Sequence, residues 1–184
     1  PWMSVACQTE GASIWFPCKN YQGDEAKQVI ERYIVPDNVI AIGNGRLTEQ
    51  GLATFERKKT KVYTWVTKNP VNTYNIAFYI GQYSHWTDTI KGKKGNLTMD
   101  YYTLTQNQSR AKAHFQQAKT MMTCFEEKLG PYPFYEDGYK LVEAPFLGME
   151  HQSAIAYGNG YQMGYEGYDI SESGVGLLFD YIIV

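Results

Sequence analysis

The spacing of apolar and polar positions changes once along this chain, close to residue 107. Up to that point apolar residues tend to alternate with polar ones, which indicates strands with one buried face. One such run places Tyr74, Ile76, Phe78 and Ile80 on the same face. Expected strands are 29–35, 39–42, 61–67, 74–80 and 97–104. Their number and spacing predict an antiparallel sheet or sandwich.

Beyond residue 107 the apolar residues follow the period of an amphipathic helix. Steps of four and three residues separate Ala111, Phe115, Ala118, Met122, Phe125 and Leu129. Ser109 precedes this face and could cap the helix with its hydroxyl. Gly130 and Pro131 predict where the helix ends, because glycine accepts a left-handed turn and proline cannot continue a helix. The change of period predicts a domain boundary near residue 107.

After the expected helix the pattern becomes short and irregular. Residues 139–143 and 152–157 are expected to be strands, and the glycine- and tyrosine-rich stretch 158–176 is expected to be a loop. The apolar run 177–184 fits a strand or an unfinished helix equally well by its pattern alone.

Composition and charge exclude several classes of partner. With 43% hydrophobic residues and a net charge of -2, the chain can build a core but offers no electrostatic attraction to nucleic acid or to an anionic membrane surface. No window approaches the roughly 20 apolar residues of a membrane span. Three cysteines without a C-x-x-C pair argue against a disulfide framework and leave only a Cys7–Cys18 pairing open.

Candidate chemistry centres on one carboxylate. The chain has no H-E-x-x-H motif, and His85, His114 and His151 lie too far apart in sequence to predict the converging ligands of a zinc site. Glu150, by contrast, follows the apolar run 145–149. A carboxylate there either faces solvent, forms an internal salt bridge, or receives a cation from outside, because burial without a partner is costly.

Several short segments occur in an order that is typical of one enzyme family. They are Gln8, Phe16-Pro17-Cys18, Gly130-Pro131-Tyr132-Pro133-Phe134, Tyr139-Lys140-Leu141-Val142 and Gly148-Met149-Glu150-His151. Together they resemble the aminopeptidase N and leukotriene hydrolase family of zinc metallopeptidases, also called gluzincin aminopeptidases. The resemblance covers nearly the whole chain, and its most specific parts are the Pro-Cys and Met-Glu segments.

The resemblance implies an α+β fold in two parts. Residues 1–107 would be the later part of a β-rich amino-terminal domain, and residues 108–184 would be the start of a thermolysin-like catalytic domain. The family's H-E-x-x-H helix would then follow Val184, so 177–184 is expected to lead into a helix. The zinc of the full-length parent would be bound by residues beyond this chain, and the fragment alone would bind no metal and be inactive.

The same resemblance implies roles for individual residues. In the family, the glutamate of the Met-Glu motif, here Glu150, binds the free α-ammonium of a peptide substrate. The glutamine before the Pro-Cys pair, here Gln8, also reaches that ammonium. Gly148 and Met149 would line the substrate cleft with their backbone, and His151 would lie beside it. The expected partners are therefore peptides with a free amino terminus.

The chain departs from the family pattern at three positions. Leu147 replaces the first glycine of the motif, His151 replaces its asparagine, and Ser13 replaces an arginine near the Pro-Cys pair. A histidine at position 151 could titrate near neutral pH and add a pH dependence. These changes put the preference for particular residues in doubt more than the reaction class.

Two other functions compete with the peptidase interpretation. A non-catalytic relative could keep this fold as an interaction scaffold, and the sequence of residues 1–184 does not exclude it. An aromatic-rich β module that binds carbohydrate is the third hypothesis. It would require solvent-exposed rings at Trp15, Trp65 or Trp86.

Overall fold

The computed structural model describes residues 1–8 and 10–184, and most of its regular structure is β-sheet. The amino-terminal strands form three small sheets. These are β1 (Met3–Ser4), β8 (Tyr79–Gly81) and β4 (Ile40–Ile42); β3 (Ile30–Pro36), β6 (Lys58–Val66) and β5 (Arg46–Phe55); and the pair β2 (Glu25–Ala26) and β7 (Val71–Asn72). All of their pairings are antiparallel.

A five-stranded mixed sheet follows, in the order β12-β13-β11-β10-β9. Its strands are β9 (Tyr83–Gly92), β10 (Gly95–Leu104), β11 (Tyr139–Glu143), β12 (Gly148–Met149) and β13 (Ile155–Tyr157). The helices are α1 (Gln108–His114) and α2 (Gln117–Leu129), with 3-10 turns at Ala12–Ile14, Thr73–Asn75 and Thr105–Asn107.

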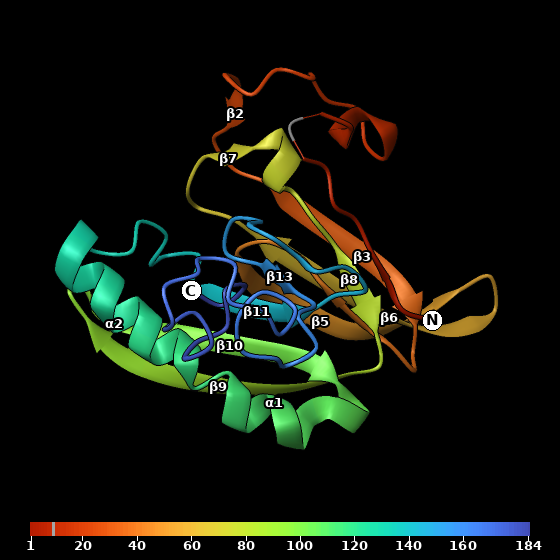
Figure 1. Ribbon diagram of the computed structural model, residues 1–184. Helices are drawn as coiled ribbons and strands as arrows, with labels where there is room; N and C mark the ends of the chain where they lie inside the picture. The colour runs from red at the N-terminus through yellow and green to blue at the C-terminus, as the bar shows by residue number, and fades with distance from the viewer. Residues whose placement is uncertain (9) are drawn as a thin grey trace.

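The five-stranded sheet is covered on both faces. The two helices lie along one face, and the amino-terminal strands lie on the other (Figure 1). Leu97, Met99 and Tyr101 of β10 belong to the apolar cluster under the helices, whereas Tyr102 belongs to the cluster shared with the amino-terminal strands. This alternation follows from the two-residue period of a strand. Every residue of the central strand β11 is buried.

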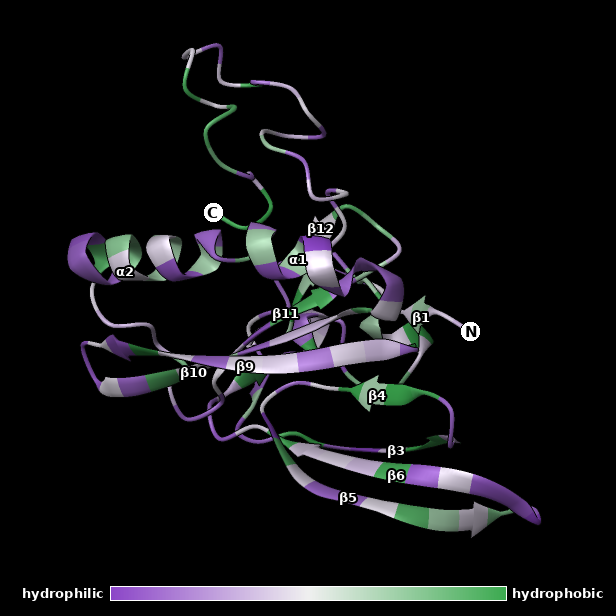
Figure 2. Ribbon diagram, turned by 90° about the horizontal axis from the view of Figure 1, so that it is seen from below, coloured by the Kyte–Doolittle hydropathy of each residue, from purple (hydrophilic) through white to green (hydrophobic). Residues whose placement is uncertain are grey.

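Most of the expected strands are confirmed. The ranges 29–35, 39–42, 61–67, 97–104 and 139–143 correspond to β3, β4, β6, β10 and β11. The expected strand 152–157 forms only over Ile155–Tyr157, since the preceding residues make a turn. Two long strands, β5 and β9, were not expected. Polar residues fill most of β9, and in β5 the apolar residues do not alternate regularly with polar ones (Figure 2).

The expected strand over 74–80 is largely wrong. Thr73–Asn75 form a 3-10 turn, and only the end of the run joins β8. Two asparagine side chains take the backbone N–H groups that a strand would have used. The Asn72 side chain accepts from the Tyr74 N–H at 3.5 Å, and the Asn44 side chain accepts from the Ala77 N–H at 2.8 Å.

The expected helix 111–129 exists but is divided in two. The i to i+3 bond from the Ala118 N–H to the Phe115 carbonyl, 3.1 Å long, marks a tight turn between α1 and α2. Ser109 lies inside α1 and does not cap it. Helix α2 ends at Leu129 as predicted, and Gly130 follows with a positive φ of 104°.

The final residues, 177–184, form turns rather than the strand or regular helix that was expected. Their last four residues approach one helical turn, with the Val184 N–H donating to the Asp180 carbonyl at 3.2 Å. The Asp180 side chain accepts from the Ile182 N–H at 2.9 Å, as an N-cap does. Asp180 thus caps a single turn.

The five-stranded sheet takes strands from both sides of residue 107, since β10 pairs in parallel with β11. The change from strand to helix at 107 therefore occurs within one layered unit, and the domain division at this position stays a prediction. All three cysteines are free. No helix in the described residues has both the length and the apolar character needed to cross a membrane.

Candidate functional site

Glu150 lies at the edge of the five-stranded sheet, directly after β12. This short strand pairs antiparallel with β13 and buries Met149 in the apolar cluster shared with the amino-terminal strands. The Glu150 side chain is exposed. Its Oε1 accepts a long hydrogen bond of 3.5 Å from the hydroxyl of Tyr74. Within residues 1–8 and 10–184, Glu150 forms no ion pair, so its carboxylate is open to a cation from outside.

The turn after Glu150 is tied to the amino-terminal half of the chain. The side chain of Asn44 donates to the carbonyl of Gln152 at 2.6 Å, and the N–H of Gly45 donates to the hydroxyl of Ser153 at 2.8 Å. The Gln152 amide donates in turn to the carbonyl of Pro70 at 2.9 Å. These groups are buried or partly buried, where hydrogen bonds fix geometry most firmly. The backbone that carries Glu150 is therefore held between a paired strand and an anchored turn.

His151 does not face solvent, although it directly follows an exposed residue. Its exposed fraction is 0%, and its Nδ1 lies 2.6 Å from the hydroxyl of Tyr79. Burial lowers the pKa of the imidazole to about 4, because the charged form loses its hydration. The expectation that His151 titrates near neutral pH is therefore wrong, and the ring is neutral there.

Gly148 and Met149 hold the edge strand in close contact with its neighbours. A Cβ atom built on Gly148 would lie 2.6 Å from Cγ2 of Ile182 and 3.3 Å from the Ala156 carbonyl. A larger residue at position 148 would therefore have to displace the Ile182 side chain. The expected role of Gly148 and Met149, to line a substrate cleft with their backbone groups, is still a prediction.

Gln8 lies on the amino-terminal segment, and its side chain is exposed. Its carbonyl accepts a backbone hydrogen bond of 2.7 Å from Glu10, shortly before the 3-10 turn Ala12–Ile14. In the described part of the chain, no hydrogen bond joins Gln8 to Glu150. Their joint role in binding an ammonium remains a prediction.

The side chains of residues 1–8 and 10–184 do not fit a zinc site. The described residues contain no group of three or more histidine, cysteine, aspartate or glutamate side chains that could hold a metal ion. The three histidines lie on different elements with separate partners. His85 Nε2 lies 2.8 Å from Asp100, His114 Nε2 lies 2.7 Å from Asp180, and His151 contacts Tyr79.

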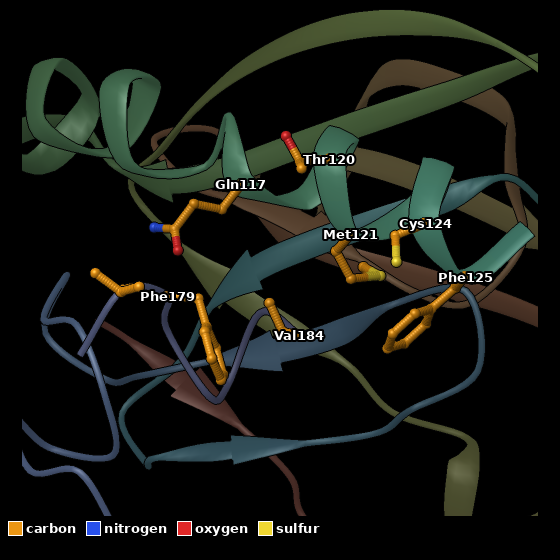
Figure 3. Close-up of a pocket in the computed structure, with 8 residues that line it drawn as sticks. Gln117, Thr120, Met121, Cys124, Phe125, Phe179 and Val184 are labelled. Carbon is orange, nitrogen blue, oxygen red and sulfur yellow. The ribbon is translucent and has the colours of Figure 1, made fainter. Parts of the chain in front are cut away.

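An apolar hollow of about 410 Å³ lies elsewhere, between α2 and the last residues of the chain. Figure 3 shows Met121, Cys124 and Phe125 of α2 on one side of it and Phe179 and Val184 on the other. Neither Glu150 nor Gln8 lines this hollow. Its walls offer no carboxylate or imidazole for acid–base chemistry, so its chemistry is that of a packing surface.

The third hypothesis, an aromatic carbohydrate-binding face, loses its support. Trp65 is buried with 3% exposure, and its ring N–H donates to the Ala41 carbonyl at 3.0 Å. Trp86 is partly buried and stacks on Tyr101, with ring centroids 5.1 Å apart. Trp15 is also only partly exposed and packs against Phe78. None of the three rings is presented as an open platform.

Sequence reasoning missed the residues that support Glu150. Tyr74, Tyr79 and Asn44 lie 76, 75 and 108 residues from their hydrogen-bond partners Glu150, Ala154 and Gln152. No motif joins positions so far apart. The only local signal was the presence of single polar groups in apolar runs. Such groups indicate buried hydrogen bonds but do not identify the partners.

Comparison with known proteins gives a match in structure only. No model of a known protein family matches the sequence, and no curated protein does. Among solved structures, a two-domain M1 zinc metallopeptidase mutant bound to L-tryptophan has a TM-score of 0.67 at 19% identity, covering 85% of this chain and 35% of that one.

A second structure of this kind is an M1 zinc metallopeptidase mutant from Deinococcus radiodurans bound to a Tyr-Ser-Ala substrate. It has a TM-score of 0.67 at 19% identity and covers 85% of this chain and 36% of that one. A further structure of the Deinococcus radiodurans mutant has a TM-score of 0.63 at 18% identity, with 85% and 35% coverage. The chain therefore shares the fold of part of the M1 zinc metallopeptidases, and it spans about a third of the length of these structures.

Proposed function

We propose that this chain is part of a zinc-dependent aminopeptidase, in which it holds the amino end of a peptide substrate. Glu150 and Gln8 supply the acceptors for the substrate's α-ammonium. In this proposal residues 1–107 belong to the amino-terminal β-rich domain, and residues 108–184 begin the thermolysin-like domain. The zinc ligands belong to other parts of the parent protein, so the chain alone is inactive.

One observation carries the proposal: Glu150 is an exposed carboxylate that pairs with no cation among the residues the structure describes, and its backbone is fixed on both sides. A glutamate that only kept the surface soluble would need no such support. Met149 before it is buried, and the turn after it is bonded to Asn44 and Gly45. A fixed carboxylate binds a cation with less loss of conformational entropy than a mobile one.

The chemistry of Glu150 suits a primary ammonium. An ammonium has three donors and no acceptor, so it needs several oxygen atoms around it. A carboxylate gives a charge-assisted hydrogen bond, and the amide oxygen of Gln8 would add a directional one. Anchoring the amino end would place the first peptide bond at a fixed distance from the anchor, which limits cleavage to one terminal residue.

The ligands of the structural neighbours support this chemistry. One neighbour was solved with L-tryptophan and another with a Tyr-Ser-Ala substrate. L-tryptophan is a free amino acid and so carries an α-ammonium, which is the group that we assign to Glu150.

The test compares free and blocked substrates in the full-length parent. Leucine 4-nitroanilide and its N-acetyl form would be assayed with the wild type, Glu150→Gln and Glu127→Gln. Glu127 is an exposed glutamate on α2 and serves as the matched control. We expect Glu150→Gln to reduce kcat/KM for the free substrate strongly and Glu127→Gln to leave it unchanged.

Two results would contradict the proposal. Wild-type kinetics in Glu150→Gln would remove Glu150 from amine binding. A parent with no peptidase activity towards either substrate, under conditions in which its metal content is verified, would favour the non-catalytic scaffold instead.

A further inference from the structure

The turn that follows Glu150 contains a buried polar contact that amine binding does not itself use. The hydroxyl of Tyr79 lies 2.6 Å from Nδ1 of His151 and 2.6 Å from the carbonyl of Ala154. It thereby joins the first and last residues of the turn 151–154. The N–H of Ala154 also donates to the carbonyl of His151 at 3.0 Å, which closes the turn.

The protons in this contact can be assigned from the donors and acceptors present. The Ala154 carbonyl can only accept, so the single hydroxyl proton of Tyr79 goes to it. The Tyr79 oxygen must then accept, and Nδ1 of His151 is the donor. The ring therefore carries its proton on Nδ1, and Nε2 is a bare acceptor. Among the described residues this buried Nε2 has no partner.

A bare buried acceptor is unfavourable, so His151 is not explained by stability alone. An apolar ring of similar shape would avoid that penalty but could not donate to Tyr79. What the imidazole adds is one directed N–H bond to a rigid tyrosine. Tyr79 itself has 0% exposure and lies in β8, the central strand of its three-stranded sheet.

We propose that His151 is a positioning residue, which acts through Tyr79 and Ala154 to fix the turn that places the Glu150 carboxylate for a ligand ammonium. This inference rests on the proposed function of Glu150. His151 does not contact the ligand. It sets the direction in which the chain leaves β12, and the Tyr74 hydroxyl meets the Glu150 carboxylate on the exposed side.

The first test measures the ring itself in the 184-residue chain. Long-range ¹H–¹⁵N NMR spectra of the imidazoles distinguish the two neutral tautomers and follow their titration. We expect His151 to be protonated on Nδ1 and to show no titration between about pH 5.5 and 8. A proton on Nε2, or titration in that range, would overturn the inference.

The second test is a double-mutant cycle in the full-length parent, with the same free and blocked leucine anilides. Tyr79→Phe removes only the hydroxyl that joins His151 to Ala154. We expect a rise in KM for the free substrate of about three- to tenfold, the range for one hydrogen bond. In a Glu150→Gln background the same substitution should change KM no further, because the carboxylate that it positions is gone.

Tyr63→Phe is the matched control. Tyr63 is 2% exposed and lies in the same apolar cluster, but its hydroxyl faces the Val39 carbonyl at 3.5 Å instead of the turn. It should leave KM unchanged. Suppose that Tyr79→Phe and Tyr63→Phe change KM equally while Glu150→Gln raises it. The positioning role of His151 is then wrong, but the proposed role of Glu150 still holds. If Glu150→Gln has no effect, the proposed function fails, and this inference fails with it.

Discussion

Two segments lie beside the edge strand β12, and they are bonded to different parts of the molecule. The turn 151–154 is bonded to residues on several separate parts of the amino-terminal half, including Asn44, Pro70 and Tyr79. The final segment, 177–184, is held by the Asp180 carboxylate, by backbone hydrogen bonds with Gly164, and by Ile183, which is 4% exposed. The final segment reaches β12, where Ile182 lies against Gly148.

The difference shows how the fold treats a segment that carries a candidate site. The turn is fixed by polar bonds to several separate elements, and the bond between Tyr79 and His151 is one of them. Most side-chain hydrogen bonds of the final segment converge on the Asp180 carboxylate. Leu177, Leu178 and Val184 are exposed at 50%, 73% and 45%. In sequence, residues 151–154 are mostly polar and residues 177–184 are mostly apolar. Their polar partners also differ.

Removing the carboxylate of Asp180 should have the largest effect on how firmly the final segment is held relative to the turn. Asp180 is fully buried and accepts from His114 and Tyr157 at 2.7 Å, from Asn159 at 2.8 Å and from the Ile182 N–H. Asp180→Ala leaves these donors unpaired, so we expect a loss of about 3–5 kcal/mol in the free energy of unfolding. Urea unfolding measures it.

Hydrogen exchange separates the two segments in that variant. The amides of Ile182 and Val184 should exchange much faster, while those of Gln152 and Ser153 should change little. The exposed Asp37→Ala serves as control and should alter neither. If amide exchange became equally faster in both segments, Asp180 would support the whole sheet edge. The two segments would then not be held independently.

The next largest effect is the pH dependence that His151 adds to the free energy of unfolding. Its pKa is about 4 in the folded chain and 6.5 in the unfolded one. Between these values only the unfolded chain binds the proton, so stability is complete above about pH 6.5 and falls as the pH drops towards 4. The loss in the free energy of unfolding is on the order of 3 kcal/mol. Urea unfolding of wild type and His151→Asn from pH 4 to 7 measures it; parallel curves would contradict the assignment.

Much of the sheet could be predicted from the sequence, because β6, β10 and β11 have the period or apolar density of buried strands. The strands β5 and β9 could not be predicted, since their pairing rather than their composition defines them. The helical spacing was correct, but it could not separate α1 from α2. It also counted Phe125 and Leu129 as buried, and they are 40% and 80% exposed.

The candidate site was predicted only in part. Glu150 was found because the order and spacing of short segments resemble those of a known family. Its exposure agrees with a carboxylate that faces solvent, one of the alternatives that the sequence left open. The burial of His151 could not be foreseen, because it depends on Tyr79, 72 positions earlier in the chain. Contacts over such separations follow from the sheet topology, which local patterns do not specify.

The effect on ligand binding is expected to be smaller than these effects on stability. In the full-length parent, Glu150→Ala should weaken substrate binding or transition-state stabilisation by about 1.5–3 kcal/mol, the range for a hydrogen bond to a charged group. The fold should be unchanged, since the side chain is exposed. Steady-state kinetics with leucine 4-nitroanilide measures the change, and a thermal unfolding curve confirms the fold. A loss of similar size with the N-acetyl substrate would argue against recognition of the amine.

The smallest effect should come from Leu178, whose side chain is 73% exposed. Leu178→Ser removes apolar surface from the rim of the hollow beside α2, so the free energy of unfolding should stay within about 0.5 kcal/mol of wild type. Self-association of the 184-residue chain, measured by sedimentation, should decrease, because exposed apolar patches drive association. Ile183→Ser is the matched comparison, since Ile183 is 4% exposed and its loss should cost at least about 2 kcal/mol. If both substitutions destabilise the chain equally, Leu178 is part of the core, and the final segment is held as firmly as the turn beside Glu150.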